Sequence, residues 1–166
     1  MFKKLLVILG LVISLGTIVI MVGCSSGDTA NAGPYPDVVI TPTVSNDTVS
    51  IPISIIESKR NVHFELATTK GDTSFEAYLF NNEIQVRASF CVPCQGTSFT
   101  LSDDELVCNN CGTVFSAKDG TGIRGVAACR GYPKAAVSFT KTDSSIVMQS
   151  SDLLVAFNNT LSPGLP

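Results

Sequence analysis

The chain has 166 residues, of which 45% are hydrophobic and 15% charged, and its formal net charge is −3. Two of its lysines lie in an apolar N-terminal segment, so the remainder is more acidic still, and it contains no basic cluster that could neutralise phosphates. The composition therefore argues against a nucleic-acid partner and predicts one domain with a modest core.

The first 23 residues have the features of an export signal. Two lysines precede an apolar run from Leu5 to Val22, which is long enough to span a membrane, and Gly23 stands directly before Cys24. The sequence around Cys24 resembles a bacterial lipoprotein box. We therefore expect a lipoprotein signal peptide over 1–23 and lipidation of Cys24, with an uncleaved anchor or ordinary secretion as alternatives. Each of the three interpretations places residues 25–166 outside the cytoplasm, and the first two attach them to a membrane of the bacterial cell envelope.

Composition divides the rest of the chain into three parts. Residues 24–48 are rich in glycine, proline, serine, threonine, asparagine and aspartate, and we expect them to form a flexible tether. Residues 49–157 have the size of one domain, and residues 158–166 are expected to be a C-terminal tail.

Alternating apolar and polar residues predict a series of short strands. The first runs from Ser50 to Ile56, with Pro52 near a sheet edge. Others are expected to pair as hairpins or to lead into cysteines: 61–69 with 73–80, 84–90 before Cys91, 98–101 with 105–107, and 135–141 with 146–149. No long amphipathic helix is visible, and 112–131 is expected to form glycine-rich loops, so the predicted class is mostly β.

Two cysteine doublets carry the strongest chemical signal. Cys91 and Cys94 form one C-x2-C motif, Cys108 and Cys111 form a second, and a predicted hairpin joins them. Two such turns can place four sulfurs about 2.3 Å from one ion, as zinc and iron sites require. The extracytoplasmic address leaves disulfides open as an alternative, and free or redox-active thiols are a third.

Four further residues bear on the predicted metal site. Cys129 is left over after the doublets are assigned, and it is a fifth ligand, a redox partner or a small buried residue. The only histidine, His63, is favoured as a hydrogen-bonded strand residue over a ligand. Gly112 suits a knuckle turn with positive φ, and Phe115 is expected to pack beneath the site.

Enzyme chemistry finds little support in the sequence. A thioredoxin-like mechanism at Cys91 requires a helix N-terminus, whereas a predicted strand precedes this residue and no helical pattern follows. No nucleophile pairs with the single histidine, and no glycine-rich phosphate loop is present. The sequence favours a non-catalytic metal-binding or electron-transfer module.

The segments 87–94 and 106–115, followed by Ala128 and Cys129, together resemble the FtrD-like membrane iron–sulfur family. That family has a C-x2-C, a short hairpin, a C-x2-C followed by an aromatic residue, and a last cysteine in a Gly-Gly-Cys loop. The resemblance covers about residues 50–155. This chain departs from the family pattern where Ala127 and Ala128 replace the paired glycines.

The resemblance implies an extracytoplasmic, membrane-associated module that binds iron or an iron–sulfur cluster and is linked to iron uptake. It matches Cys91, Cys94, Cys108 and Cys111 to the family's doublets, Cys129 to its last cysteine and His63 to a histidine before the sheet.

The sequence as a whole predicts a single β-rich domain with two cysteine knuckles, like a zinc-ribbon or rubredoxin hairpin, on an extended sheet. The four doublet cysteines are the expected metal ligands, with Cys129 and, less favoured, His63 as additional candidates. The expected function is electron transfer or iron handling with redox or iron-transport partner proteins. A structural zinc ribbon and a disulfide-stapled binding module are the alternatives.

Overall fold

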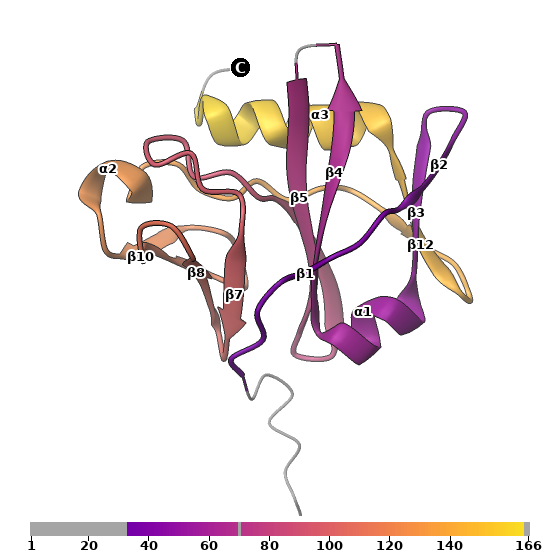
Figure 1. Cartoon of the computed structure of the whole chain (residues 1–166), viewed down its shortest axis with the longest axis horizontal. Helices are drawn as coiled ribbons and strands as arrows, with labels where there is room; N and C mark the ends of the chain where they lie inside the picture. Colours follow the sequence, from indigo (N-terminus) through magenta and orange to yellow (C-terminus); the bar gives the residue numbers. More distant parts are fainter. Residues whose placement is uncertain (1–32, 70, 165–166) are drawn as a thin grey trace, which may run out of the picture.

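The computed structural model of the chain describes residues 33–69 and 71–164. Within these residues the strands form three small four-stranded sheets, accompanied by short helices (Figure 1). The expected mostly β class is confirmed, but the single extended sheet is wrong. The expected signal peptide 1–23, the expected lipidation site Cys24 and the first part of the expected tether lie outside the described residues. In the described part of the chain, every helix is too short or too polar to cross a membrane.

The first sheet has the order β1-β4-β5-β6 and contains the predicted 61–80 hairpin. Its strands are β1 (Val38–Val39), β4 (Asn61–Thr68), β5 (Gly71–Phe80) and β6 (Glu83–Ala88). β1 pairs with β4 in parallel, and the other neighbours are antiparallel. β6 confirms the strand expected to lead toward Cys91.

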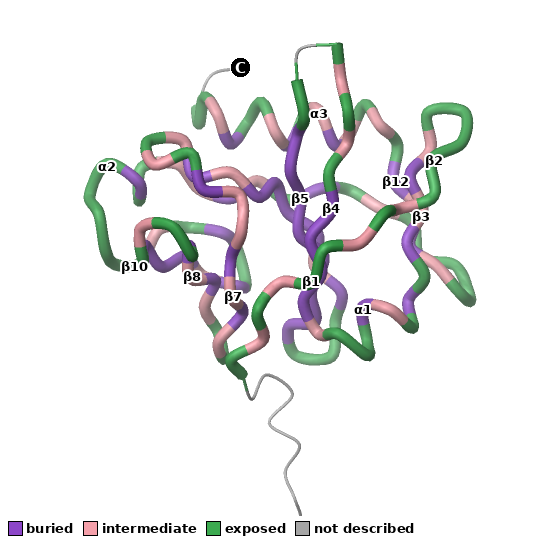
Figure 2. Tube along the Cα trace, in the orientation of Figure 1, coloured by how far each residue is buried: buried purple, intermediate pink, exposed green. Residues whose placement is uncertain are grey.

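Strand β5 is buried on both faces from Thr73 to Phe80, at the centre of the molecule (Figure 2). Successive side chains of a strand point to opposite faces. Phe75, Ala77 and Leu79 accordingly enter one hydrophobic core, while Tyr78 and Phe80 enter another. β5 is thus the wall that the two cores share.

The second sheet closes the first core, and two helices pack beside it. It has the order β11-β12-β3-β2 and consists of β2 (Thr43–Ser45), β3 (Thr48–Pro52), β11 (Thr140–Lys141) and β12 (Ser145–Gln149). The helices are α1 (Ile53–Lys59) and α3 (Ser150–Leu161). We call these two sheets with α1 and α3 the main lobe.

Several expectations for this lobe are corrected. Strands β1 and β2 lie within 24–48, so the ordered fold begins before residue 49 and a tether cannot occupy that whole segment. The strand expected over 50–56 ends at Pro52, and α1 begins at the next residue. The helix buries Ile53 and Ile56, which lie on one of its faces. Helix α3, which the sequence did not predict, runs through residue 157 into the expected tail.

The third sheet has the order β10-β9-β8-β7 and surrounds the second core. It consists of β7 (Phe99–Ser102), β8 (Glu105–Cys108), β9 (Val114–Ser116) and β10 (Gly122–Arg124), followed by α2 (Ala127–Arg130). The β7–β8 hairpin confirms the predicted link between the cysteine doublets. Residues 112–131, expected to be irregular, instead contain β9, β10 and α2. We call residues 89–132 the cysteine lobe.

Arg87 joins the two lobes. From β6 in the main lobe, its Nε donates to the Tyr78 hydroxyl at 2.9 Å, and its Nη1 and Nη2 donate to the carbonyls of Lys134 and Lys118 at 3.0 and 2.6 Å. The Tyr78 hydroxyl in turn donates to the carbonyl of Ala117 at 2.6 Å. These bonds, of which the three from the Arg87 guanidinium are charge-assisted, fix the cysteine lobe on the wall formed by β5.

Candidate metal centre

The two cysteine doublets fold into the same turn. The residue after each doublet donates its N–H to the carbonyl of the first cysteine: Gln95 to Cys91 at 2.7 Å, and Gly112 to Cys108 at 2.9 Å. Both donors have left-handed backbone, with φ of 58° and 68°. The positive φ expected at Gly112 is therefore confirmed, and Gln95 adopts it without the help of a glycine.

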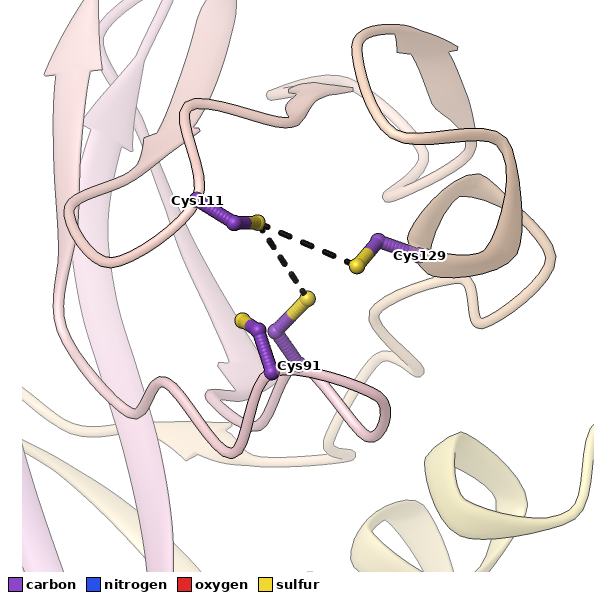
Figure 3. Close-up of side chains that lie close together, drawn as sticks. Cys91, Cys111 and Cys129 are labelled. Carbon is purple, nitrogen blue, oxygen red and sulfur yellow. Dashed lines mark hydrogen bonds between the residues drawn. The ribbon is translucent and has the colours of Figure 1, made fainter.

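Five cysteines gather where these turns meet α2. The sulfurs of Cys91 and Cys111 lie 3.9 Å apart, and those of Cys94 and Cys108 lie 3.8 Å apart. Cys129, carried by α2, approaches from the opposite side and places its sulfur 3.8 Å from that of Cys111 (Figure 3). Each contact joins different segments of the chain, so the fold has brought the thiols together.

The four cysteines whose sulfurs lie closest together are not the four that the sequence predicted as metal ligands. The four sulfurs that all lie within 4.8 Å of one another belong to Cys91, Cys94, Cys111 and Cys129. Cys108 contacts Cys94 but stands outside this group. Cys129 is thus part of the cluster, whereas His63 lies elsewhere, beside Asp37 and Glu76.

The five cysteines within the described residues are all free thiols. Their sulfur contacts are far longer than the 2.05 Å or so of a disulfide. Two sulfurs bound to one tetrahedral ion at about 2.3 Å stand roughly 3.8 Å apart, which is the spacing of the contacts observed here. The donor set and its spacing therefore fit a thiolate-bound metal or iron–sulfur centre.

Gly96 lies against the sulfurs of Cys108 and Cys94, where a side chain would not fit without a shift. A Cβ at this position would lie 2.9 Å from the sulfur of Cys108 and 3.4 Å from that of Cys94. The Gly96 carbonyl also accepts a hydrogen bond from the Cys91 N–H at 2.7 Å. The backbone of the first turn therefore passes directly against the cysteine cluster.

Lys134 places a buried cation beside the cluster. It is 1% exposed, and its ammonium donates to the carbonyls of Phe90 and Tyr132 at 2.7 and 2.8 Å. The ammonium also lies over the Phe115 ring, 4.3 Å from its centroid. Burial lowers the pKa of Lys134 to about 8, although the neighbouring cysteines act to raise it. Deprotonated sulfurs would hold this ammonium in its charged form.

The thiols differ in how readily they ionise. Burial raises the pKa of Cys91 and of Cys129, and it raises the pKa of Cys108 to about 11, against hydrogen bonds from the backbone N–H groups of Cys111 and Asn110. Burial also raises the pKa of Cys111, but hydrogen bonds with Thr113 and with the thiols of Cys94 and Cys108 outweigh it and bring the value to about 6. A bound metal would have to supply the charge that stabilises the three more basic thiolates.

Sequence reasoning found the doublets and the packing role of Phe115, which is fully buried. It did not find Lys134 or Thr113. A single lysine after a proline and a single threonine beside a glycine carry no pattern, so their roles depend on contacts between distant segments.

Comparisons with known proteins bear on this site. The profile of the family described as "Membrane iron-sulfur containing protein FtrD-like" matches residues 56–158. A search of curated proteins found no match. A chain in the solved structure described as "Complex of reduced oxygenase and oxidized ferredoxin in carbazole 1,9a-dioxygenase" is similar, with a TM-score of 0.50 and 11% identity. The similarity covers 64% of this chain and 95% of that one, and at this identity it shows a shared fold.

Proposed function

This chain belongs to the FtrD-like family of membrane iron–sulfur-containing proteins, and on that premise we propose that its cysteine lobe transfers single electrons at the outer face of a membrane. The family name and the clustered cysteines imply an iron–sulfur cluster. Bound there, the cluster would supply one-electron chemistry with little change in geometry. The observation that carries the proposal is the convergence of five sulfurs beside one buried ammonium.

The two doublets are the ligand set that we favour. Their sulfurs form two pairs, Cys91 with Cys111 and Cys94 with Cys108, and each pair joins the first knuckle to the second. A cluster with two irons needs two such pairs of ligands. A Rieske-type centre needs two histidines, and the chain has one. All four ligands are therefore thiolates, with Cys129 beside them as a fifth sulfur.

Redox function is also supported by the surroundings of the cluster. A buried cation stabilises the more negative, reduced state of a thiolate-bound cluster, and hydrogen bonds to sulfur do the same. Lys134 is such a cation, and the Thr113 hydroxyl, which accepts from the Cys111 thiol at 3.2 Å, can donate to that sulfur once it is ionised. The similar fold occurs in a complex of a reduced oxygenase with an oxidised ferredoxin, which is a setting for electron exchange between proteins. Redox or iron-transport proteins of the envelope are the partners that we propose.

A structural zinc ribbon is the second candidate. Four sulfurs within 4.8 Å of one another suit a single tetrahedral ion, and zinc would contribute folding energy without redox chemistry. The two candidate sites share Cys91, Cys94 and Cys111 and differ in whether Cys108 or Cys129 is the fourth ligand, so metal content and colour separate the two functions.

The decisive experiment is anaerobic purification of the whole chain, followed by measurement of iron, zinc and acid-labile sulfide and by visible spectroscopy. An iron–sulfur cluster should give a coloured protein that contains iron and sulfide and bleaches reversibly with dithionite. A colourless protein with one zinc per chain, and no reducible absorption after iron reconstitution, would overturn the electron-transfer proposal in favour of the zinc ribbon.

Membrane attachment through lipidated Cys24 is part of the same proposal. It is supported by the charged start, the apolar run and the small residue before Cys24, together with the family's membrane association. Mass spectrometry of the membrane-extracted N-terminus should find Cys24 acylated and residues 1–23 removed. An intact leader, or an unmodified Cys24 on soluble protein, would contradict this assignment.

A further inference from the structure

Three polar side chains meet in the main lobe away from the cysteine cluster. His63 on β4 and Glu76 on β5 are paired across the sheet, and Asp37 immediately precedes β1, the strand on the other side of β4. One ligand atom from each of Asp37, His63 and Glu76 lies within 4.8 Å of the others. Three neighbouring strands thus bring one imidazole and two carboxylates to a single point.

The imidazole is buried and has a nitrogen without a partner. His63 is 5% exposed, and its Nδ1 has no hydrogen-bond partner within the described residues. This nitrogen points toward Asp37, whose Oδ2 is 3.8 Å away, which is too long for a hydrogen bond. Glu65 lies 3.6 Å from Nε2, on the other side of the ring, and a proton at Nε2 would leave the lone pair of Nδ1 available to a metal ion.

The two carboxylates are positioned by neutral donors and lack a cationic partner. Ser98 donates its hydroxyl to Asp37 Oδ1 at 2.7 Å, and the Phe99 N–H donates to Glu76 Oε1 at 3.1 Å. In residues 33–69 and 71–164, neither carboxylate forms an ion pair with a lysine or arginine. Burial first, and then the charge of Asp37, raises the pKa of Glu76; the charge of Lys134 acts in the opposite direction without outweighing them, so a further positive charge or a proton would stabilise this cluster.

We propose that Asp37, His63 and Glu76 bind a divalent first-row transition metal ion at a site separate from the cysteine cluster. Nitrogen and oxygen ligands about 2.1 Å from one ion stand roughly 3 to 4.2 Å apart, so the observed group needs only a small contraction to coordinate it. One imidazole with two carboxylates suits ions such as Mn²⁺, Fe²⁺ and Zn²⁺. The ion would supply the missing partner of His63 Nδ1 and the missing charge.

The site is linked to the second cysteine knuckle by hydrogen bonds. Asn109, inside the Cys108–Cys111 doublet, donates its side-chain amide to the Ser98 hydroxyl at 2.6 Å, and Ser98 donates to Asp37. The proposed metal ligand Asp37 is therefore connected, through Ser98, to Asn109 of the second cysteine turn. This site goes beyond the proposed electron transfer and does not depend on it.

Mn²⁺ is the probe that separates the two sites, because it prefers oxygen and nitrogen ligands to thiolates. Purified whole chain, with its cysteine centre as isolated, is titrated with Mn²⁺, and free ion is followed by its EPR signal. We expect saturation near one Mn²⁺ per chain. Asp37→Asn and Glu76→Gln should each weaken binding by about tenfold or more, since each keeps the side-chain shape but removes a charged ligand.

Glu83→Gln is the matched control, because Glu83 is an exposed glutamate at the start of β6. It should bind Mn²⁺ as the unchanged protein does. Melting temperatures and the cysteine-centre absorption report whether each variant is folded. Binding that is only millimolar, that survives both Asp37→Asn and Glu76→Gln, or that is lost equally in Glu83→Gln would overturn the site. These outcomes do not depend on whether the cysteine lobe holds iron or zinc.

Discussion

The ammonium of Lys134 lies 4.3 Å from the centroid of the Phe115 ring, on the side of the cysteine lobe where the sulfurs gather. The ring face and two carbonyls partly replace the water that this cation has lost. A lysine that is 1% exposed and has no carboxylate partner among the described residues is costly to bury unless another anion is near. The sulfurs of a metal centre, when ionised, provide this negative charge, and the carboxylate of Glu76 also acts on the ammonium.

Replacing Lys134 by methionine should therefore lower the reduction potential of an iron–sulfur centre. Reduction adds negative charge, and the buried cation stabilises the reduced state more than the oxidised one. We expect a shift of about −60 mV, which for one electron is about 1.4 kcal/mol. Spectroelectrochemical titration measures it. The exposed Lys118→Met variant is the control, and an unchanged potential in Lys134→Met would show that the ammonium does not act on the cluster.

Serine substitutions distinguish the ligand set. Cys91→Ser, Cys94→Ser, Cys108→Ser and Cys111→Ser should each lose most of the iron and lower the melting temperature, because metal binding energy is folding energy. Cys129→Ser should keep its iron and show an altered spectrum or potential. Iron analysis and thermal unfolding provide the measurements. Iron retained in Cys108→Ser but lost in Cys129→Ser would assign the ligands to the four mutually close sulfurs instead.

A methyl group at position 96 should disturb the centre sterically. Gly96→Ala places its Cβ 2.9 Å from the sulfur of Cys108, and that turn cannot retreat without breaking the Cys91 hydrogen bond. We expect reduced iron occupancy and about 1–3 kcal/mol lower stability, as for overpacked cores. Gly131→Ala is the control, since its Cβ would meet only one carbonyl oxygen at an ordinary 3.6 Å. Equal iron content in both variants would contradict the close packing at Gly96.

Glu76→Gln should stabilise protein that has been treated with a chelator. The pKa of Glu76 is raised above 4.5 in the folded state by burial, so the folded chain binds the extra proton, and stability falls as pH rises from about 4.5 through that higher value. Glutamine removes this loss and can still accept the Phe99 hydrogen bond.

The expected gain is about 1 kcal/mol near pH 8, or roughly 2–4 °C in melting temperature, and little at pH 4.5. Thermal unfolding at both pH values, with Glu83→Gln alongside, measures it. A gain that is the same at both pH values would show that proton binding by Glu76 is not its source.

Local patterns were sufficient to predict the longer hairpins and the two doublets, but not β1, β2, β9 and β10. The 61–80 hairpin and the β7–β8 hairpin follow from residues that alternate over a few positions. The same local reasoning failed at α1, because the isoleucine-rich segment after Pro52 suits a strand as well as a short helix. Packing of Ile53 and Ile56 against the main-lobe core decides for the helix.

Contacts between residues far apart in the sequence determine the parts of the sites that local patterns did not predict. Cys129 reaches the cluster only because α2 folds back over the second knuckle, and Lys134 enters the core because Arg87 holds its carbonyl. The grouping of Asp37 with His63 depends on the parallel pairing of β1 with β4, which brings a segment expected to be a tether onto the sheet. None of these neighbours is close in sequence.

Strand β3 shows that the segment matched by the family profile is shorter than the segment needed to complete the fold. The family match begins at residue 56, but Val49 and Ile51 of β3 are fully buried, and all five residues of β3 pair with β12. A fragment cut at residues 56 and 158 would leave β12 with an open, apolar edge and would remove Thr160, whose hydroxyl accepts the N–H of Ala135 at 2.9 Å. Such a fragment would retain every cysteine of the cluster and still be expected to aggregate through its exposed strand.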